Sequence, residues 1–499
     1  MNDSILAFDI GLTNAKVILW SAEGELLDRA RVRYPTYHPQ ADWAEQRPED
    51  WWKAILEGMW MLHERSAPAL EKVVAISVTG HMHALVCLDE HGQALGPSFV
   101  LGDQRSIAES QCLAEEIGLQ QVYRITGARS DASMPIAKIR WLNHHQPEIC
   151  RQTSVFMACK DWIRHRLTGD VFTDPVDACA TSLYDLQGRN WSPELTRWAG
   201  IQHPQLPTIV DSCHISGGLD REAARALGIK MGIPVVVGAG DDVEVLGNGL
   251  LEAGLSLEHL GTTGSILTVS DHLVYDPQMA VEIYPHTIPG LWVLGGSVTA
   301  AGSAMTWVEQ VLDETNRKDS SVKTLLAPNL QSPLVFLPHL VGERCPEWDP
   351  YARGCWMGLS SMHRKQDLYR AVMEGITFSL KRVLDSIEGL VGIQKKVTVT
   401  GEVGSDWWLI IRANIYDRLL AVLKTDEPTA LGAMILAAVG VGIYPDIPSA
   451  TRYLAQMASH IQPDDLLAGD YAKLYRLYCT VEEATRAVMR QWQSENFPL

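Results

Sequence analysis

The fold follows from Ser4-Ile-Leu-Ala-Phe-Asp-Ile-Gly-Leu-Thr-Asn-Ala-Lys-Val-Ile-Leu-Trp20, an apolar strand that enters a glycine turn and leaves it as a second apolar strand. The pattern returns in Ser256-Leu-Glu-His-Leu-Gly-Thr-Thr-Gly-Ser-Ile-Leu-Thr-Val269, at an offset of 250 in a chain of 499 residues. Such a turn lets backbone N–H groups and hydroxyls approach an anion, because glycine has no Cβ and tolerates positive φ. Gly-Thr turns also occur in ordinary hairpins, so either copy alone leaves both interpretations open.

The two copies differ in the charges that they carry. A constant offset pairs Asp9 with His259, Gly11 with Gly261, Thr13 with Thr263, and Lys16 with Ile266. Only the first copy therefore has a carboxylate and a cation beside its turn. Two phosphate turns, one of them with a carboxylate that could serve Mg²⁺, predict an ATP-using enzyme whose active site lies between two related halves.

The composition limits the partners and the compartment. The formal net charge is −18, from 42 Lys and Arg against 60 Asp and Glu, which argues against a nucleic-acid or acidic-membrane partner. The nine cysteines show no C-x-x-C spacing, and no apolar run reaches about 18 residues. We therefore expect free thiols, no membrane span and a cytoplasmic location.

The order of predicted elements repeats along the chain. Apolar and turn patterns predict strands at 5–8, 15–20, 26–34, 73–78, 85–88 and 233–238, with helices at 48–65 and 106–117. They predict further strands at 256–260, 265–269, 292–295, 397–400 and 419–423, with helices at 301–312, 366–387 and 429–439. The expected class is α/β, with a first domain over 1–248 and a second over 249–499.

The segment 238–249, Gly-Ala-Gly-Asp-Asp-Val-Glu-Val-Leu-Gly-Asn-Gly, is the strongest single element. Its first acid, Asp241, follows two glycines at the end of a predicted buried strand and opens a helix. An N-cap would explain that position. A general base would also explain it, because phosphoryl transfer needs a carboxylate beside the acceptor hydroxyl.

Five motifs in a fixed order resemble the FGGY family of carbohydrate kinases, and most of all its xylulokinase branch. They are Asp9-Ile-Gly11, Gly240-Asp241, Gly261-Thr-Thr-Gly264, the stretch 336–354 around Gly342-Glu-Arg344, and Glu427-Pro-Thr-Ala-Leu-Gly-Ala433. Lys160-Asp-Trp162 and the segment 173–178 also fit, so the resemblance covers nearly the whole chain. It implies two ribonuclease-H-like domains of the actin and sugar-kinase superfamily, with a cleft between them.

The resemblance also assigns roles to residues. It makes Asp241 the catalytic base and Asp9 the carboxylate near Mg²⁺, reached through water. The implied ATP-binding residues are Gly11, Thr13, Lys16, Gly261, Thr262, Thr263, Gly302, Gly401 and Ser405. The implied sugar-binding residues are Met82, His83, Asp103, Arg105 and Asp242. From the residues alone, a core histidine would explain His83, and a surface ion pair would explain Asp103 with Arg105.

Four positions depart from the family pattern. Leu12 replaces a hydroxyl residue in the first turn, and Glu402 replaces a glycine on the adenine side. Leu101-Gly102 replaces Trp-Asn, and His81 replaces Gln on the sugar side. The acceptor therefore stays open among xylulose, ribulose, gluconate and a glycerol-like polyol. A chaperone-like ATP switch and a non-catalytic sugar sensor are the alternatives to an enzyme, and a homodimer is the family-level expectation.

Overall fold

The chain folds into two compact units that are each assembled from separate segments. The computed structural model describes residues 3–201, 203–312, 328–401, 404 and 406–494. The first unit contains 1–251, 283–292 and 427–456, and the second contains 252–282, 293–426 and 457–499. The division into domains at residue 248 stays a prediction, because these units follow contacts and exchange segments along the chain.

A six-stranded mixed sheet forms the centre of the first unit. Its order is β13 (Ile215–Gly218), β14 (Pro234–Val236), β5 (Val73–Gly80), β1 (Ser4–Ile10), β2 (Asn14–Ser21) and β3 (Leu26–Arg33). Strand β2 is antiparallel to both of its neighbours, β1 and β3, while β5 runs parallel to both β1 and β14. Every residue of β1 is buried, so both faces of this central strand are covered, as its apolar run predicts.

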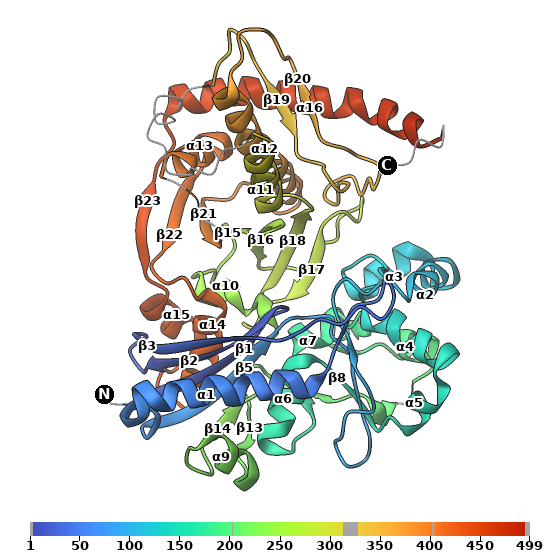
Figure 1. Ribbon diagram of the computed structural model, residues 1–499, viewed down its shortest axis with the longest axis vertical. Helices are drawn as coiled ribbons and strands as arrows, with labels where there is room; N and C mark the ends of the chain where they lie inside the picture. Colours follow the sequence, from blue (N-terminus) through green and yellow to red (C-terminus); the bar gives the residue numbers. More distant parts are fainter. Residues whose placement is uncertain (1–2, 202, 313–327, 402–403, 405, 495–499) are drawn as a thin grey trace. The chain divides into compact units, whose positions relative to one another are not determined.

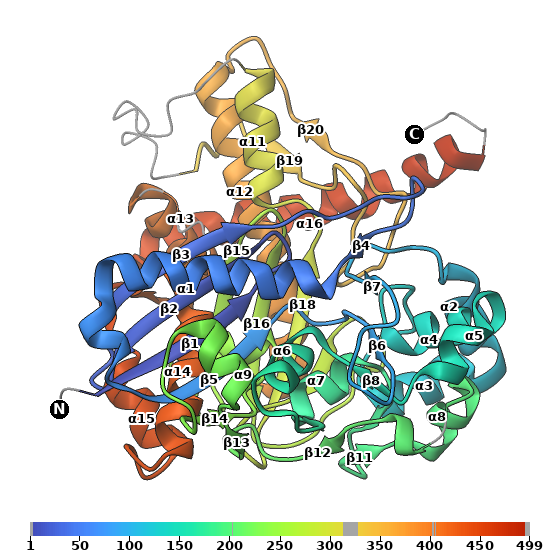
Figure 2. The ribbon, with the colours of Figure 1, turned by 60° about the horizontal axis from the view of Figure 1, so that its bottom comes forward.

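Helices cover the two faces of this sheet. Leu6 and Phe8 of β1 pack in one cluster with Trp51 and Ile55 of α1 (Pro48–Leu70), which lies across β2 and β3 in Figure 2. Helix α14 (Pro428–Gly440) packs against β1 and β5 on the opposite face, as Figure 1 shows. Alternate residues of a strand point to opposite faces, which is why β1 can bury both.

The first unit contains further short strands and helices outside this sheet. Its short strands are β4 (Glu45–Gln46), β6 (Val86–Leu88), β7 (Ser98–Phe99), β8 (Val155–Met157), β9 (Phe172–Thr173), β10 (Tyr184–Asp185), β11 (Asn190–Trp191), β12 (Thr208–Ile209) and β17 (Glu282–Pro285), of which Glu282 belongs to the second unit. Its helices are α2 (Ile107–Leu113), the π turn Ala114–Gly118, α3 (Leu119–Thr126), α4 (Pro135–His145), α5 (Pro147–Gln152), α6 (Cys159–Thr168), α7 (Pro175–Ala180), α8 (Pro193–Ala199), α9 (Arg221–Leu227), α10 (Glu244–Gly247) and α15 (Ile447–Leu454), with 3₁₀ turns at His203–Gln205 and Asp241–Val243.

The second unit repeats the strand order of the first. Its strands run β18 (Trp292–Val298), β16 (Gly264–Ser270), β15 (Leu255–Leu260), β21 (Lys396–Gly401), β22 (Leu419–Leu423) and β23 (Met457–Ile461), where Trp292 itself belongs to the first unit. Strand β15 is antiparallel to β16 and parallel to β21, and β21 is parallel to β22. The duplicated ribonuclease-H-like arrangement expected from the sequence is therefore present.

Helices and one hairpin complete the second unit. They are α11 (Gly302–Val311), the pair β19 (Val335–Leu337) and β20 (Cys355–Met357), α12 (Lys365–Val391), α13 (Asp406–Tyr416) and α16 (Asp465–Ser494). Among the described residues, no helix is both long and apolar enough to cross a membrane.

The two glycine turns differ in length, which corrects one predicted equivalence. Asp9 pairs across the strands with Lys16, whereas His259 pairs with Ser265. The Gly11 N–H donates to Asn14 O, but the Gly261 N–H donates to Thr263 O, one residue closer. The second turn is one residue shorter, so the constant offset fails after the turn, and Ser265 rather than Ile266 stands where Lys16 stands.

Candidate active site

Asp241 begins a 3₁₀ turn directly after the β14 strand and its glycines. Gly238 has φ 75°, and a Cβ there would lie 2.0 Å from Val78 O, so only glycine lets the turn approach β5 this closely. The Asp241 carboxylate accepts a hydrogen bond from the backbone N–H of Met82. The turn thus brings Asp241 against the segment that follows β5.

The charges around Asp241 raise its pKa. Burial contributes most, and the neighbouring carboxylates of Asp242, Glu244 and Asp9 add to it, so the pKa lies well above the usual range. Each of these carboxylates disfavours the negative charge of an ionised Asp241. The structure therefore gathers four acidic side chains, including the predicted base and the predicted metal carboxylate.

Met82 and His83 lie in the turn beyond β5, and both are partly exposed. His83 has φ 66°, an uncommon conformation for a residue other than glycine. A Cβ on Gly240 would lie 2.7 Å from Met82 Cγ, which shows how closely the two turns pack. His81, in contrast, is buried and hydrogen-bonds through Nδ1 to Ile10 O, and burial lowers its pKa to about 4. It acts as a neutral link between β1 and β5.

Asp103 and Arg105 form a buried pair, so the interpretation as a surface ion pair is wrong. The Arg105 Nε donates to Asp103 Oδ1 at 2.9 Å, and Nη2 donates to Asp103 Oδ2 at 2.8 Å and to Glu45 Oε1 at 2.7 Å. The guanidinium lies 3.8 Å from the ring centroid of Trp43 and 3.7 Å from that of Phe99. Its Nη1 is buried and has no hydrogen-bond partner among the described residues.

The first glycine turn is held by side chains that the sequence analysis did not single out. Tyr34 donates its hydroxyl to Gly11 O, and Gln46 donates Nε2 to Leu12 O at 2.8 Å. Trp51 Nε1 in turn donates to Gln46 Oε1 at 2.8 Å. These bonds fix the backbone of the turn while Thr13 stays exposed. The only feature of the sequence that could have indicated Tyr34 and Gln46 is that both are polar residues near the ends of strands.

Lys16 is bound by two carboxylates. Its Nζ lies 3.1 Å from Asp9 Oδ2 and 2.6 Å from Glu427 Oε2, and Glu427 also contacts Arg29 and Arg31. Burial lowers the pKa of Lys16, but the two carboxylates outweigh burial and raise it above its usual value. Glu427 was noticed only as part of a motif, and its contact with Lys16 was not predicted.

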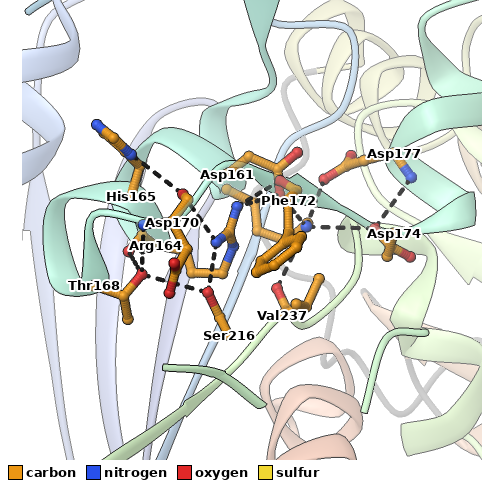
Figure 3. Close-up of polar contacts among 11 residues, drawn as sticks. Asp161, Arg164, His165, Thr168, Asp170, Phe172, Asp174, Asp177, Ser216 and Val237 are labelled. Carbon is orange, nitrogen blue, oxygen red and sulfur yellow. Dashed lines mark hydrogen bonds and ion pairs between the residues drawn. The ribbon is translucent and has the colours of Figure 1, made fainter. Parts of the chain in front are cut away.

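A buried ion network lies beneath the Asp241 turn, and Figure 3 shows its aspartates. Lys160 Nζ lies 2.6 Å from Asp161 Oδ1 and 3.3 Å from both Asp174 Oδ1 and Asp177 Oδ2, and it donates to Val237 O at 3.4 Å. Asp177 also lies beside the turn, because a Cβ on Gly240 would meet its Oδ1 at 2.8 Å. The network ties α6 and α7 to the end of β14.

The glycine turn of the second unit lies against the start of α11. The N–H groups of Gly302 and Ser303 donate to Gly261 O and Thr262 O, at 2.9 Å and 3.1 Å. The side chains of Thr262 and Thr263 are exposed. Gly401, at the end of β21, has φ 80°, and a Cβ on it would lie 2.2 Å from Leu260 O. The structure thus brings Gly261, Gly302 and Gly401 together.

The structure does not place two of the residues that the sequence analysis singled out. Ser405 and Glu402 lie outside the described residues. No group of three or more His, Cys, Asp or Glu side chains within the described ranges is arranged to hold a metal ion.

Comparison with known proteins assigns the family. Models of the N-terminal and C-terminal domains of the FGGY family of carbohydrate kinases match residues 4–246 and 259–441. The chain belongs to the FGGY family of carbohydrate kinases. It is an ATP-dependent carbohydrate kinase, which confirms the predicted family and class of enzyme.

Individual relatives cover nearly the whole chain. A xylulose kinase from Escherichia coli is 30% identical over 470 residues, which span 92% of this chain and 96% of that protein. The structure of a ligand-bound xylulose kinase from Lactobacillus acidophilus has a TM-score of 0.92 and 29% identity, covering 98% of this chain and 100% of that one. A gluconate kinase from the same species has a TM-score of 0.91 and 28% identity, covering 98% and 99%. These likenesses confirm the predicted fold.

Proposed function

We propose that this kinase transfers the γ-phosphate of ATP to a hydroxyl of a ketopentose such as xylulose, with Asp241 as the general base. The observation that carries the proposal is the contact between the Asp241 carboxylate and the backbone N–H of Met82. It joins the acid that follows Gly238 and Gly240, beyond the end of β14, to the segment in which sugar-binding residues are expected. The xylulose kinases among the relatives support this acceptor.

The chemistry assigned to Asp241 is proton removal. The acceptor hydroxyl gives its proton to the Asp241 carboxylate as its oxygen attacks the γ-phosphorus in line and the bond to ADP breaks. The raised pKa makes the Asp241 carboxylate a stronger base than an ordinary aspartate. The acids around Asp241 therefore serve the reaction although they oppose its ionisation.

The acceptor contacts follow from the first unit. We assign Met82, His83 and Asp242 to one side of the sugar, and Asp103 with Arg105 to another. The unsatisfied Nη1 of Arg105 supports this role, because a buried donor without a protein acceptor is costly unless a ligand or water meets it. Three acids around Asp241 favour an uncharged sugar over gluconate, whose carboxylate they would repel.

The nucleotide contacts are assigned to both glycine turns. Gly11, Thr13 and Lys16 would hold phosphates in the first unit, and Gly261, Thr262, Thr263 and Gly302 in the second. Gly401 and Ser405 would lie on the adenine side. The exposed hydroxyls of Thr13, Thr262 and Thr263 support this assignment, because hydroxyls donate well to phosphate oxygens.

The acidic residues fit Mg²⁺ through water. Mg²⁺ prefers oxygen ligands and gives up its waters reluctantly, and Asp9 contributes a buried carboxylate next to Asp241. Asp9 is already paired with Lys16, so we propose that it contacts the metal's waters rather than the metal. When bound, Mg²⁺ would neutralise charge on the phosphates. The homodimer and the cytoplasmic location stay predictions.

The test measures ADP release with Mg-ATP against xylulose, ribulose, gluconate and glycerol. We expect the highest kcat/KM with xylulose, and a loss of several orders of magnitude in Asp241→Asn while ATP still binds. Higher kcat/KM with gluconate would overturn the acceptor. If no acceptor raises turnover above basal ATP hydrolysis, the chain is a sensor or switch, and the proposed function is wrong.

A further inference from the structure

Lys138, in the first turns of α4, is a fully buried lysine whose partners are all backbone carbonyls. Its Nζ donates to His83 O at 2.7 Å and to both Phe99 O and Val100 O at 3.2 Å. An ammonium group has three N–H donors, and here each has one acceptor. Within the described part of the chain, no carboxylate pairs with it.

The three carbonyls belong to the two segments that carry the expected sugar-binding residues. His83 follows Met82 in the turn after β5. Val100 O also accepts the backbone N–H of Asp103 at 3.2 Å, and Phe99 O also accepts the backbone N–H of Leu85 at 3.1 Å, so one backbone hydrogen bond already joins the two segments. The ring of Phe99 stacks on Arg105. Among the described residues, Lys138 is thus the one side chain that hydrogen-bonds to both segments.

Lys160 shows what a buried lysine looks like when it serves an ion network. Lys160 lies among three aspartates, which outweigh burial and raise its pKa. For Lys138, burial lowers the pKa to about 7, because only Asp103 and Asp131 oppose it and Arg105 adds to the effect. A lysine kept among carbonyls is held there for its hydrogen bonds rather than for a salt bridge.

We propose that Lys138 is a positioning residue for the acceptor sugar. Its ammonium group fastens the His83 turn to the Phe99–Val100 segment and so sets the spacing between Met82 and Arg105. This inference rests on the proposed function, since it assumes that both segments contact the sugar. It assigns Lys138 no contact with the substrate. The uncommon φ of His83 supports it, because a strained turn needs its carbonyl held.

Loss of the proton would weaken this fastening. A neutral amine has two N–H donors and a lone pair, so one of the three carbonyls loses its hydrogen bond to Lys138 and faces a lone pair instead. The charged groups that bear on Lys138 are Asp103 and Asp131, which favour the proton, and Arg105, which disfavours it. His81 is also close, and it is neutral at the pH of interest. The acceptor site should therefore loosen as the pH rises above about 7.

The first test is kinetic and uses Lys138→Met, which keeps the length of the side chain but donates no hydrogen bond. We expect the KM for the sugar to rise about tenfold or more, because His83 O loses the Lys138 donor and the side-chain link between the two segments is lost, while the KM for ATP changes less than about twofold. The matched control is Arg140→Met on the same helix, because Arg140 donates to Trp198 O at 2.9 Å instead. Equal changes in both KM values, or an equal effect in the control, would overturn the proposal.

The second test does not depend on which acceptor is phosphorylated. Hydrogen exchange of peptides covering 80–85 and 98–105 is measured without ligand at about pH 6 and about pH 8.5, with correction for the intrinsic exchange rate. In the unmodified protein, protection should fall at the higher pH, and in Lys138→Met it should be low at both. If Lys138→Met keeps full protection, the fastening is wrong whatever the substrate is. If protection behaves as expected but no sugar is phosphorylated, the proposed function fails and the fastening stands.

Discussion

The ammonium group of Lys16 lies 2.6 Å from a carboxylate oxygen of Glu427, although the two residues are 411 positions apart in the chain. Glu427 stands at the start of α14, and its side chain is almost wholly buried. This contact joins the first glycine turn to a helix from the far end of the sequence. The contact also holds the Lys16 ammonium group near Asp9, where we propose that a nucleotide phosphate binds.

Glu427→Gln should therefore destabilise the first unit. The substitution leaves Lys16, Arg29 and Arg31 close together without their shared carboxylate, and we expect a loss of about 2 kcal/mol in the free energy of unfolding, moderated because the three cations are partly exposed. Urea denaturation measures it. Lys473→Met removes an exposed pair within one helix and should cost less than about 0.5 kcal/mol. Equal stability of Glu427→Gln and the unmodified protein would contradict the expected role.

Asp241→Asn should lose turnover but gain thermal stability at neutral pH. The folded protein raises the pKa of Asp241, so the folded state binds that proton more tightly than the unfolded chain does. Its contribution to stability then falls as the pH rises from the unfolded pKa, near 4, through the folded one. Asparagine does not ionise, so the difference in Tm should be near zero at about pH 4 and clearly positive at about pH 8. A difference in Tm that does not change with pH would show that folding does not raise the pKa of Asp241.

Gln46→Leu should weaken ATP binding without changing the KM for the sugar. It leaves Leu12 O and Trp51 Nε1 without their partner, so the backbone of the first glycine turn is no longer fixed. We expect the KM for ATP to rise about tenfold. Gln205→Leu is a matched control, since Gln205 Nε2 donates to Thr153 O at 2.9 Å in another part of the unit. It should lower stability without affecting the nucleotide.

Arg105→Lys should raise the KM for the sugar although the charge is kept. Lysine cannot bond both oxygens of Asp103 and reach Glu45 at the same time, and it cannot stack flat between Trp43 and Phe99. We expect about a tenfold rise in that KM and an unchanged KM for ATP. Arg151→Lys in the exposed pair with Glu148 is the control, with no effect on either. A sugar KM that stays the same in Arg105→Lys would remove Arg105 from the site.

Much of the fold could be predicted, because periodicity and glycine turns are local signals. The predicted strand at 419–423 matches β22, and the predicted helix at 429–439 matches α14 within one residue at each end. What the sequence could not show is where α14 packs. An apolar helix fits any apolar face, and its contact with β1 depends on the tertiary fold rather than on a pattern.

The site was predictable only in part, for the same reason. Motifs located Asp241 and Met82 separately, but the contact between them arises only from the tertiary fold. Lys138 was missed because a lysine on a helix normally indicates an exposed face. Nothing in the local pattern distinguishes it from a surface lysine, since its three acceptors are backbone carbonyls, which every residue has.

The place of α14 in the first unit has a consequence for how the protein is made. Strand β1 precedes α14 in the chain, so the ribosome delivers β1 first and α14 only when Gly440 has emerged. Until then the apolar residues of β1 and β5 that α14 covers lack this partner, so the first unit cannot bury them fully before the α14 segment is made.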